Sequence, residues 1–126
     1  MGMNNPEVTM HDQRPTNRLI AHDKALEAAS IAISVVLKVP APLRSLADQV
    51  VRSASSVPAN LAEGAGRAGK DRAYHWRIAH GSAKEVDTHL RLLVSTGAIN
   101  ASRTRSALRL FDDVRALTWR LLHPAH

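Results

Sequence analysis

The sequence contains no cysteine and only four aromatic residues, Tyr74, Trp76, Phe111 and Trp119. The lack of cysteine excludes disulfide bonds, thiolate metal sites and a cysteine nucleophile, and it is typical of a protein in the reducing cytoplasm. Because 44% of the residues are hydrophobic but so few are aromatic, the core is expected to consist of Leu, Val, Ile and Ala. Such a core favours closely packed helices over a β-sandwich.

Long apolar segments are also missing. Residues 1–18 are polar and contain Pro6 and Pro15, without the apolar run of a signal peptide or the periodicity of a helix, so we predict a disordered N-terminal tail. The longest apolar run, around residues 31–37, is interrupted by Ser34 and is too short to span a bilayer. We therefore expect a cytoplasmic protein with no membrane role, whose single domain covers residues 19–123.

Four segments of that domain have apolar residues three and four positions apart, the period of an amphipathic helix. The first covers 25–39 and stops at Pro40 and Pro42, and the second covers 43–61 and ends in glycines that suit a left-handed C-cap. The third runs from about 70 to 96, ending at Gly97, and the fourth begins at Asn100 or Ser102 and is closed by Pro124. Since short connections force neighbouring helices antiparallel, the sequence predicts an all-α, up-down-up-down four-helix bundle.

One irregularity lies in the second helix. Pro58 removes a backbone hydrogen bond and strands the carbonyl of Ala54, at a cost of roughly 3 kcal/mol in an ordinary helix, so a kink is expected. Nearby serines, Ser56 among them, can bond to the backbone and ease it. Asn60, about one turn before Glu63, is interpreted as a partner of the freed backbone. A ligand pocket opened by the kink is the alternative.

A second irregularity lies in the third helix, where Gly81 and Ser82 precede Glu85. A glycine inside a helix costs about 1 kcal/mol relative to alanine, so Gly81 is expected to let another helix approach closely. Glu85 falls in the expected inward row, which consists of Ile78, Ser82, Glu85, His89 and Leu92, with Val86, Leu90 and Leu93 beside it. A buried carboxylate needs a partner, for which Arg52, Asn60 and the serines of the second helix are candidates. We interpret the group as a polar network that fixes helix register, with a catalytic carboxylate as the alternative.

Motifs of known chemistry are absent. The seven histidines include no His-x-x-x-His pair, and there is no Glu-x-x-His pair of the di-iron kind. The glycine-rich stretch 64–70 lacks the spacing and the preceding strand of a phosphate-binding loop. Without a nucleophile–base arrangement either, we expect no catalytic residue, no metal and no cofactor, and the protein is predicted not to be an enzyme.

The net charge of +6 lies entirely in residues 44–126, which hold 13 basic and 7 acidic side chains. Some of these charges are expected to pair four residues apart, as in Asp48–Arg52, Glu63–Arg67 and Asp87–Arg91. A basic half favours an anionic partner, nucleic acid before membrane, although a merely solvated basic surface is the alternative. The basic residues form two sequence clusters, Arg67, Lys70, Arg72 and Arg77 near the aromatic residues Tyr74 and Trp76, and Arg103, Arg105, Arg109, Arg115 and Arg120 along the fourth helix. The candidate nucleic-acid-binding residues are the four of the first cluster together with Arg103, Arg105 and Arg109. Trp76 is interpreted first as a core or subunit-interface residue, with base stacking as the alternative.

Taken together, the two irregular motifs resemble the bacterial four-helix-bundle family encoded in intervening sequences of large-subunit ribosomal RNA genes. They are also similar to the accessory variability determinant proteins of diversity-generating retroelements. The resemblance covers about residues 20–122 and is carried by Ser56, Pro58, Asn60, Glu63 and Gly64, together with Gly81, Ser82 and Glu85.

This resemblance implies a homopentameric, ring-like assembly without catalytic residues. The accessory branch implies binding of nucleic acid and of a reverse transcriptase through basic surface residues. Ala98 and Ile99 stand where an aromatic-containing turn is more usual, so the branch stays open. The predicted function is a non-enzymatic homo-oligomer that binds RNA or DNA, and the alternative is a protein-interaction scaffold with no nucleic-acid role.

Overall fold

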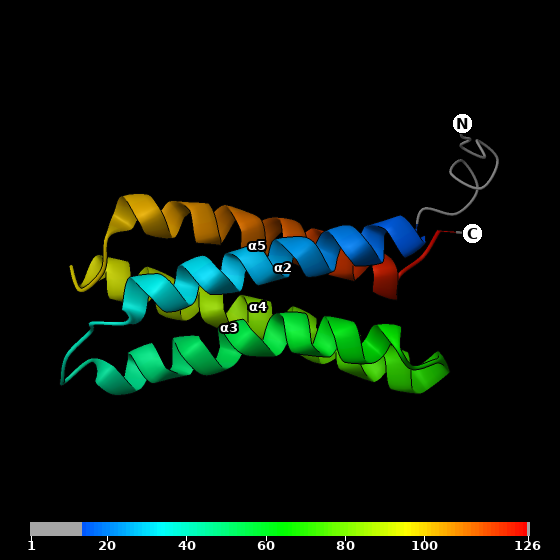
Figure 1. Cartoon of the computed structure of the whole chain (residues 1–126), viewed down its shortest axis with the longest axis horizontal. Helices are drawn as coiled ribbons and strands as arrows, with labels where there is room; N and C mark the ends of the chain where they lie inside the picture. Colours follow the sequence, from blue (N-terminus) through cyan, green and yellow to red (C-terminus); the bar gives the residue numbers. More distant parts are fainter. Residues whose placement is uncertain (1–13, 126) are drawn as a thin grey trace.

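The computed structural model describes residues 14–125, which form four α-helices. They are α2 (Arg14–Val36), α3 (Arg44–Ala65), α4 (Gly69–Ser95) and α5 (Ala101–Leu122). Successive helices run in opposite directions, and each packs against two others: α2 against α3 and α5, and α4 against α3 and α5 (Figure 1). The predicted all-α, antiparallel four-helix bundle is confirmed.

The first helix starts earlier than the sequence predicts. Residues 14–18 were expected in the tail because of Pro15, but they belong to α2. Proline is compatible with the first turn of a helix, where its missing N–H would have no partner anyway. The remainder of the expected tail, residues 1–13, lies outside the described residues. α2 ends at Val36, before the two prolines that were expected to stop it.

Small side chains line the centre of the bundle. The inner side of α2 is formed by Ala21, Ala25, Ala28 and Ala32, all fully buried. The expectation of a core without aromatic residues is wrong at Phe111, which is fully buried. Trp76 is 5% exposed, in agreement with its interpretation as a core residue. Two of the four aromatic residues therefore belong to the core.

In α4 the core row differs from the expected one. The buried hydrophobic residues of α4 are Trp76, Ala79, Ala83, Val86, Leu90 and Leu93. Of the row expected to point inward, only Ser82 is buried, and Leu92 is 48% exposed. The expected row is therefore a flank of α4, and the helix is rotated so that alanines occupy the core.

The helix ends follow capping chemistry. The Asn100 side chain accepts a 2.8 Å hydrogen bond from the N–H of Arg103, so Asn100 caps α5 as predicted. Gly97 has a φ of 78°, and the N–H groups of Gly97 and Ala98 bond to the carbonyls of Val94 and Leu93, which is a Schellman motif. The left-handed cap predicted for α3 is wrong, because Gly66 has a φ of −84°.

Among residues 14–125, no helix has both the length and the apolar character that a bilayer-spanning segment needs. Over the same range, no three His, Asp or Glu side chains come together as a metal-binding group.

Candidate nucleic-acid interface

A ladder of polar contacts joins α3 to α4, and half of the eight family-motif residues lie in it: Ser56, Asn60, Ser82 and Glu85. Its members on α3 are four residues apart and therefore share one side of the helix. The contacts are Arg52 to Glu85 at 2.5 Å, Ser56 to Ser82 at 2.9 Å, and Asn60 to His75 at 2.9 Å. Arg52 is thus the partner of Glu85, as one of the predicted candidates. Glu85 is half-buried at the boundary between α3 and α4, so the prediction that it points into the core is wrong.

Asn60 does not bond to the carbonyl that Pro58 frees. Its Nδ2 donates to the carbonyl and the hydroxyl of Ser56, at 3.0 and 3.1 Å, while its Oδ1 faces His75. α3 continues through the buried Pro58 as one helix up to Ala65 (Figure 1). The amide of Asn60 therefore ties the helix after Pro58 to the turn before it and to α4.

The glycine that permits close helix packing is Gly64, and the prediction that Gly81 has this role within the bundle is wrong. A Cβ on Gly64 would lie 2.5 Å from the indole of Trp76, whereas a Cβ on Gly81 would meet no atom within 4 Å. The Trp76 Nε1 donates to the carbonyl of Leu61 at 3.3 Å, which fixes the ring against α3. Glu63, the remaining motif residue, lies outside this contact and pairs with Arg67 at 2.8 Å.

The seven predicted nucleic-acid-binding residues do not form one site. Arg67, Lys70 and Arg72 lie where α3 turns into α4, and Arg103 and Arg105 lie where α4 turns into α5. α4 has 27 residues. At 1.5 Å per residue the two turns are about 40 Å apart, at opposite ends of the bundle. The first sequence cluster is thus separated from the second by the length of the molecule.

Three of the seven side chains pair with or donate hydrogen bonds to other residues of the bundle. Arg67 pairs with Glu63, and Arg103 donates to the hydroxyl of Ser34 at 2.8 Å. Arg72 donates to the carbonyls of Gly64 and Ala65, at 3.1 and 3.2 Å, and so caps the end of α3. Its guanidinium also lies 5.5 Å from the centre of the Trp76 ring. Arg72 is therefore a structural residue.

The other four have no ion-pair partner among residues 14–125: Lys70, Arg77, Arg105 and Arg109. Three of these lie on α4 and α5 away from the α3–α4 turn. The same two helices hold ten basic and five acidic residues, against five and four on α2 and α3. The positive charge thus belongs to one half of the bundle.

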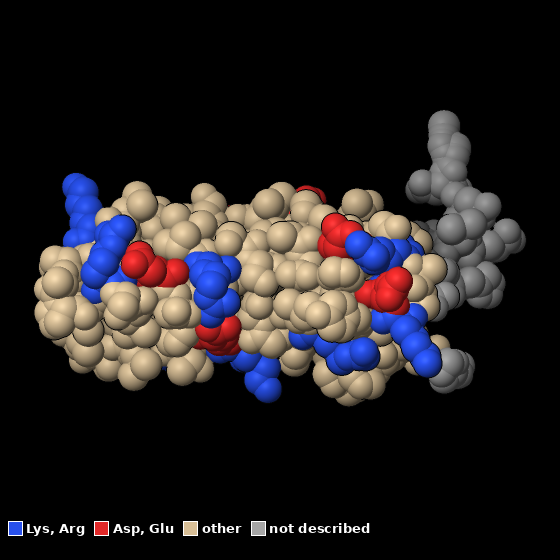
Figure 2. Space-filling view, turned by 90° about the horizontal axis from the view of Figure 1, so that it is seen from below, with Lys and Arg blue, Asp and Glu red and all other residues tan. Residues whose placement is uncertain are grey.

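The side of the bundle formed by α3 and α4 carries charges of both signs. Figure 2 shows the side formed by α3 and α4, where Lys and Arg lie next to Asp and Glu at both ends and few charges lie between. Arg44 pairs with Asp48 at 3.3 Å there, and Arg52 pairs with Glu85, so the predicted pair of Asp48 with Arg52 is wrong. A long anion would find little net attraction on this side.

On the α4–α5 side, one buried carboxylate takes up part of the positive charge. The side chain of Asp87 is 11% exposed and accepts a 2.7 Å hydrogen bond from Arg91, which raises the pKa of Arg91. Arg115 approaches Asp87 at 3.8 Å and also pairs with Asp112. Apart from Arg103, which donates to Ser34, the exposed cations of α4 and α5 without an ion-pair partner among residues 14–125 are Lys70, Arg77, Lys84, Arg105, Arg109 and Arg120.

A positive cluster surrounds His80 near the middle of this side. The pKa of His80 lies below its ordinary value of 6.5, first because of burial and then because of the positive charges of Lys84, Arg115 and His123. The cationic causes of this shift show that several positive charges lie near His80, in addition to its burial. Further along, a groove of about 360 Å³ between α4 and α5 is lined by Arg91 and Arg105 together with Val94, Ser95, Ala101 and Leu108.

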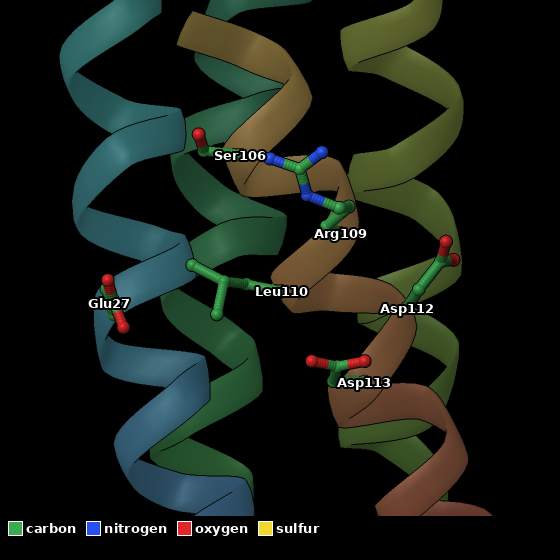
Figure 3. A pocket seen from close by; sticks show the side chains of 6 residues that line it. All are labelled: Glu27, Ser106, Arg109, Leu110, Asp112 and Asp113. Atoms are coloured by element: carbon green, nitrogen blue, oxygen red, sulfur yellow. The ribbon is translucent and has the colours of Figure 1, made fainter.

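The groove between α2 and α5 has a different character. It measures about 400 Å³ and is lined by Glu27, Ser106, Arg109, Leu110, Asp112 and Asp113. In Figure 3 the Arg109 guanidinium extends toward Ser106, away from the carboxylates of Asp112 and Asp113, while Glu27 comes from α2. With three carboxylates and one cation, this groove does not favour an anionic ligand.

Comparison with known proteins agrees with the motif and the fold. Residues 17–119 match the family described as 23S rRNA-intervening sequence proteins. The chain belongs to this family. A crystal structure of a protein of unknown function from the S23 ribosomal protein family of Bacteroides thetaiotaomicron has the same fold, with a TM-score of 0.76, 22% sequence identity, and coverage of 85% of this chain and 98% of that one. No curated protein matches the chain.

In this 23S rRNA-intervening sequence family member, sequence reasoning missed three contributors to the basic side: His80, Lys84 and Trp119. One signal was available in the sequence. His80 and Lys84 are four residues apart, as are Arg115 and Trp119, so each pair shares a helix side. That the two pairs face the same side of the bundle follows only from how α4 packs against α5.

Proposed function

We propose that this protein is a non-enzymatic homo-oligomer that binds nucleic acid through α4 and α5. The observation that carries the proposal is the uneven distribution of cations without an ion-pair partner among the described residues: Arg77, Lys84 and Arg105 lie on α4 and α5, whereas α2 and α3 are nearly neutral. Phosphate neutralisation by such side chains releases counterions and gives affinity without base recognition. RNA in the cytoplasm is the proposed ligand, and a reverse transcriptase is a further partner that the resemblance to retroelement accessory proteins implies.

Self-association is proposed on different residues. α2 has alanines on its inner side, yet Leu19 and Leu26 on its outer side, and Leu37 directly after its last residue, are 50% exposed or more. A helix that is apolar on both sides is normally covered on both. A ring of copies, a homopentamer in our proposal, would cover these leucines and leave α4 and α5 accessible. The same leucines also favour the alternative, a scaffold that binds another protein.

The nucleic-acid proposal is tested with a double variant, Arg77→Gln with Lys84→Gln. Affinity for a labelled RNA, measured by fluorescence anisotropy between about 50 and 200 mM salt, should fall on the order of tenfold or more. The slope of log K against log salt should decrease by roughly 0.7 to 0.9 for each lost phosphate contact. The matched control, Lys38→Gln with Arg44→Gln, removes the same charge from the opposite half and should bind as the parent does.

Two results would contradict the proposal. One is a parent protein that binds no RNA or DNA even at low salt. The other is an equal loss of affinity in the test and control variants, which would indicate dependence on net charge alone. A protein that ignores polynucleotides but retains a protein partner would support the scaffold function.

A further inference from the structure

The exposed aromatic residue on the basic side of the bundle is Trp119. Its indole stacks on the ring of His123, with the ring centres 4.2 Å apart and the planes 23° from parallel. The Nδ1 of His123 lies 2.9 Å from the carbonyl of Trp119, so the histidine ring is held in place by the last turn of α5. Trp119 is nevertheless 53% exposed, although a large apolar ring favours burial.

Positively charged groups surround this indole. Arg115 lies one turn before Trp119 on the same side of α5. Since α4 and α5 are antiparallel and Arg115 approaches Asp87 at 3.8 Å, Trp119 lies level with Lys84, and His123 lies level with His80. The influence of Lys84, Arg115 and His123 on His80 agrees with this register. The Trp119 ring therefore lies near two cations, Lys84 and Arg115, and two histidines, His80 and His123.

We infer that Trp119 and the cations beside it form a subsite for an unpaired nucleotide of single-stranded nucleic acid. The base stacks on the exposed side of the indole, while a neighbouring phosphate contacts Lys84, which is exposed and has no ion-pair partner among the described residues. Stacking on an aromatic ring tolerates every base, because each has a π-face, and it is out of reach for bases within a duplex. This inference rests on the proposed function and specifies the form of the ligand.

Self-association through Trp119 is disfavoured by its surroundings. Two copies joined at this side would bring the exposed Lys84 of each near that of the other, and like charges at an interface repel. Trp76, the ring next to the first basic sequence cluster, cannot serve as the platform because it is 5% exposed and packed against Gly64. A polyanion, in contrast, neutralises the charges around Trp119.

The test compares Trp119→Ala and Trp119→Phe with the parent protein, using an oligouridylate and an RNA duplex of equal length as probes. Trp119→Ala should weaken binding of the oligouridylate by about 5- to 150-fold, and Trp119→Phe should retain most of the affinity. The slope of the salt dependence should stay as in the parent, because no cation is removed. Duplex binding should be unchanged, and the quenching of tryptophan fluorescence by the oligouridylate should disappear in both variants.

Four results separate the possible failures. If the parent binds both probes and Trp119→Ala binds them equally well, the subsite is overturned and the proposed function stands. If the parent binds neither probe, both are overturned. If Trp119→Ala loses duplex and single-strand affinity in parallel, or changes the oligomer size by light scattering, Trp119 has a structural or interface role and the subsite is overturned. Circular dichroism of both variants confirms that they are folded.

Discussion

At Gly64 the absence of a side chain lets the Trp76 indole lie against α3. We expect Gly64→Ala to destabilise the fold by about 1–3 kcal/mol, because its Cβ would lie 2.5 Å from the indole and 3.1 Å from the carbonyl of Arg72. Neither the buried ring nor the α4 backbone can withdraw without disturbing the core. The free energy of unfolding in urea measures the effect.

Gly81→Ala is the matched control, since it adds the same methyl group to a helix of the same bundle. A Cβ there meets no atom within 4 Å, and alanine is the better helix former. Its expected effect is a stabilisation of about 0.5–1 kcal/mol. If Gly81→Ala were the more destabilising of the two, the packing roles assigned to these glycines would be wrong.

His80 gives the protein a pH dependence with a definite sign. Because its pKa is lowered in the folded state, the unfolded chain takes up the proton first as the pH falls below 6.5. The contribution of neutral His80 to stability is therefore complete above pH 6.5 and is lost as the pH falls from there through the folded-state pKa. Denaturation of His80→Gln and the parent, compared at about pH 7.5 and 5.5, should show a smaller loss of stability in the variant.

A second measurement tests how the charged neighbours of His80 affect its pKa. Lys84 from α4, Arg115 from α5 and His123 after α5 all lower its pKa, while the nearby Asp87 is held by Arg91 and Arg115. Replacing Lys84 by Gln should move the pKa of His80, followed by NMR, toward its ordinary value. An unchanged pKa would show that burial alone sets it.

At the scale of helices, the α3–α4 ladder explains why the family motif is polar. Arg52, Ser56 and Asn60 form one side of α3, and each contacts a different level of α4. A slip of one helix along the other would break all three contacts together. The ladder thus fixes register, as the sequence predicted, and its exposed Arg52–Glu85 pair adds less than about 1 kcal/mol.

The four helices were predictable because their periodicity and their caps are local properties. Gly97 indicates the end of α4 and Asn100 the start of α5, because their capping chemistry needs no tertiary contact. The rotation of α4 was not predictable in this way, since Ala79 and Ala83 are weak hydrophobic signals. They occupy the core because only small side chains fit where two helices approach closely.

The positive charge of the candidate nucleic-acid interface was predictable from the sequence, but the places of its residues in the bundle were not. Sequence clusters place Arg67 beside Arg72 and Arg77, yet Arg67 pairs with Glu63 and Arg72 donates to the carbonyl of Gly64 at the end of α3. Arg77 is exposed further along α4. Trp119 lies 35 residues from Lys84, and only the packing of α5 on α4 places the two at one level. Long-range arrangement of this kind has no local signal.

At the scale of the whole molecule, the bundle has two unlike halves. α4 and α5 carry a net charge of +5 and α2 and α3 a net of +1. The outer leucines of α2, in contrast, lie on the nearly neutral half. Copies of the chain can approach through the neutral half without charge repulsion, and an assembly built in this way would present the basic halves together.

We therefore expect that charges placed on the outer side of α2 dissociate the oligomer and leave the bundle folded. Leu19 and Leu26 are 69% and 50% exposed in the single chain and are seven residues apart, so they lie on one helix side. A double variant, Leu19→Glu with Leu26→Glu, should shift the mass measured by light scattering to that of a monomer, with unchanged helicity. Ser102→Glu, at an exposed position of α5, should leave the mass as it is. A parent protein that is monomeric at micromolar concentration would refute the ring, and an oligomer that survives both glutamates would place the interface on another helix.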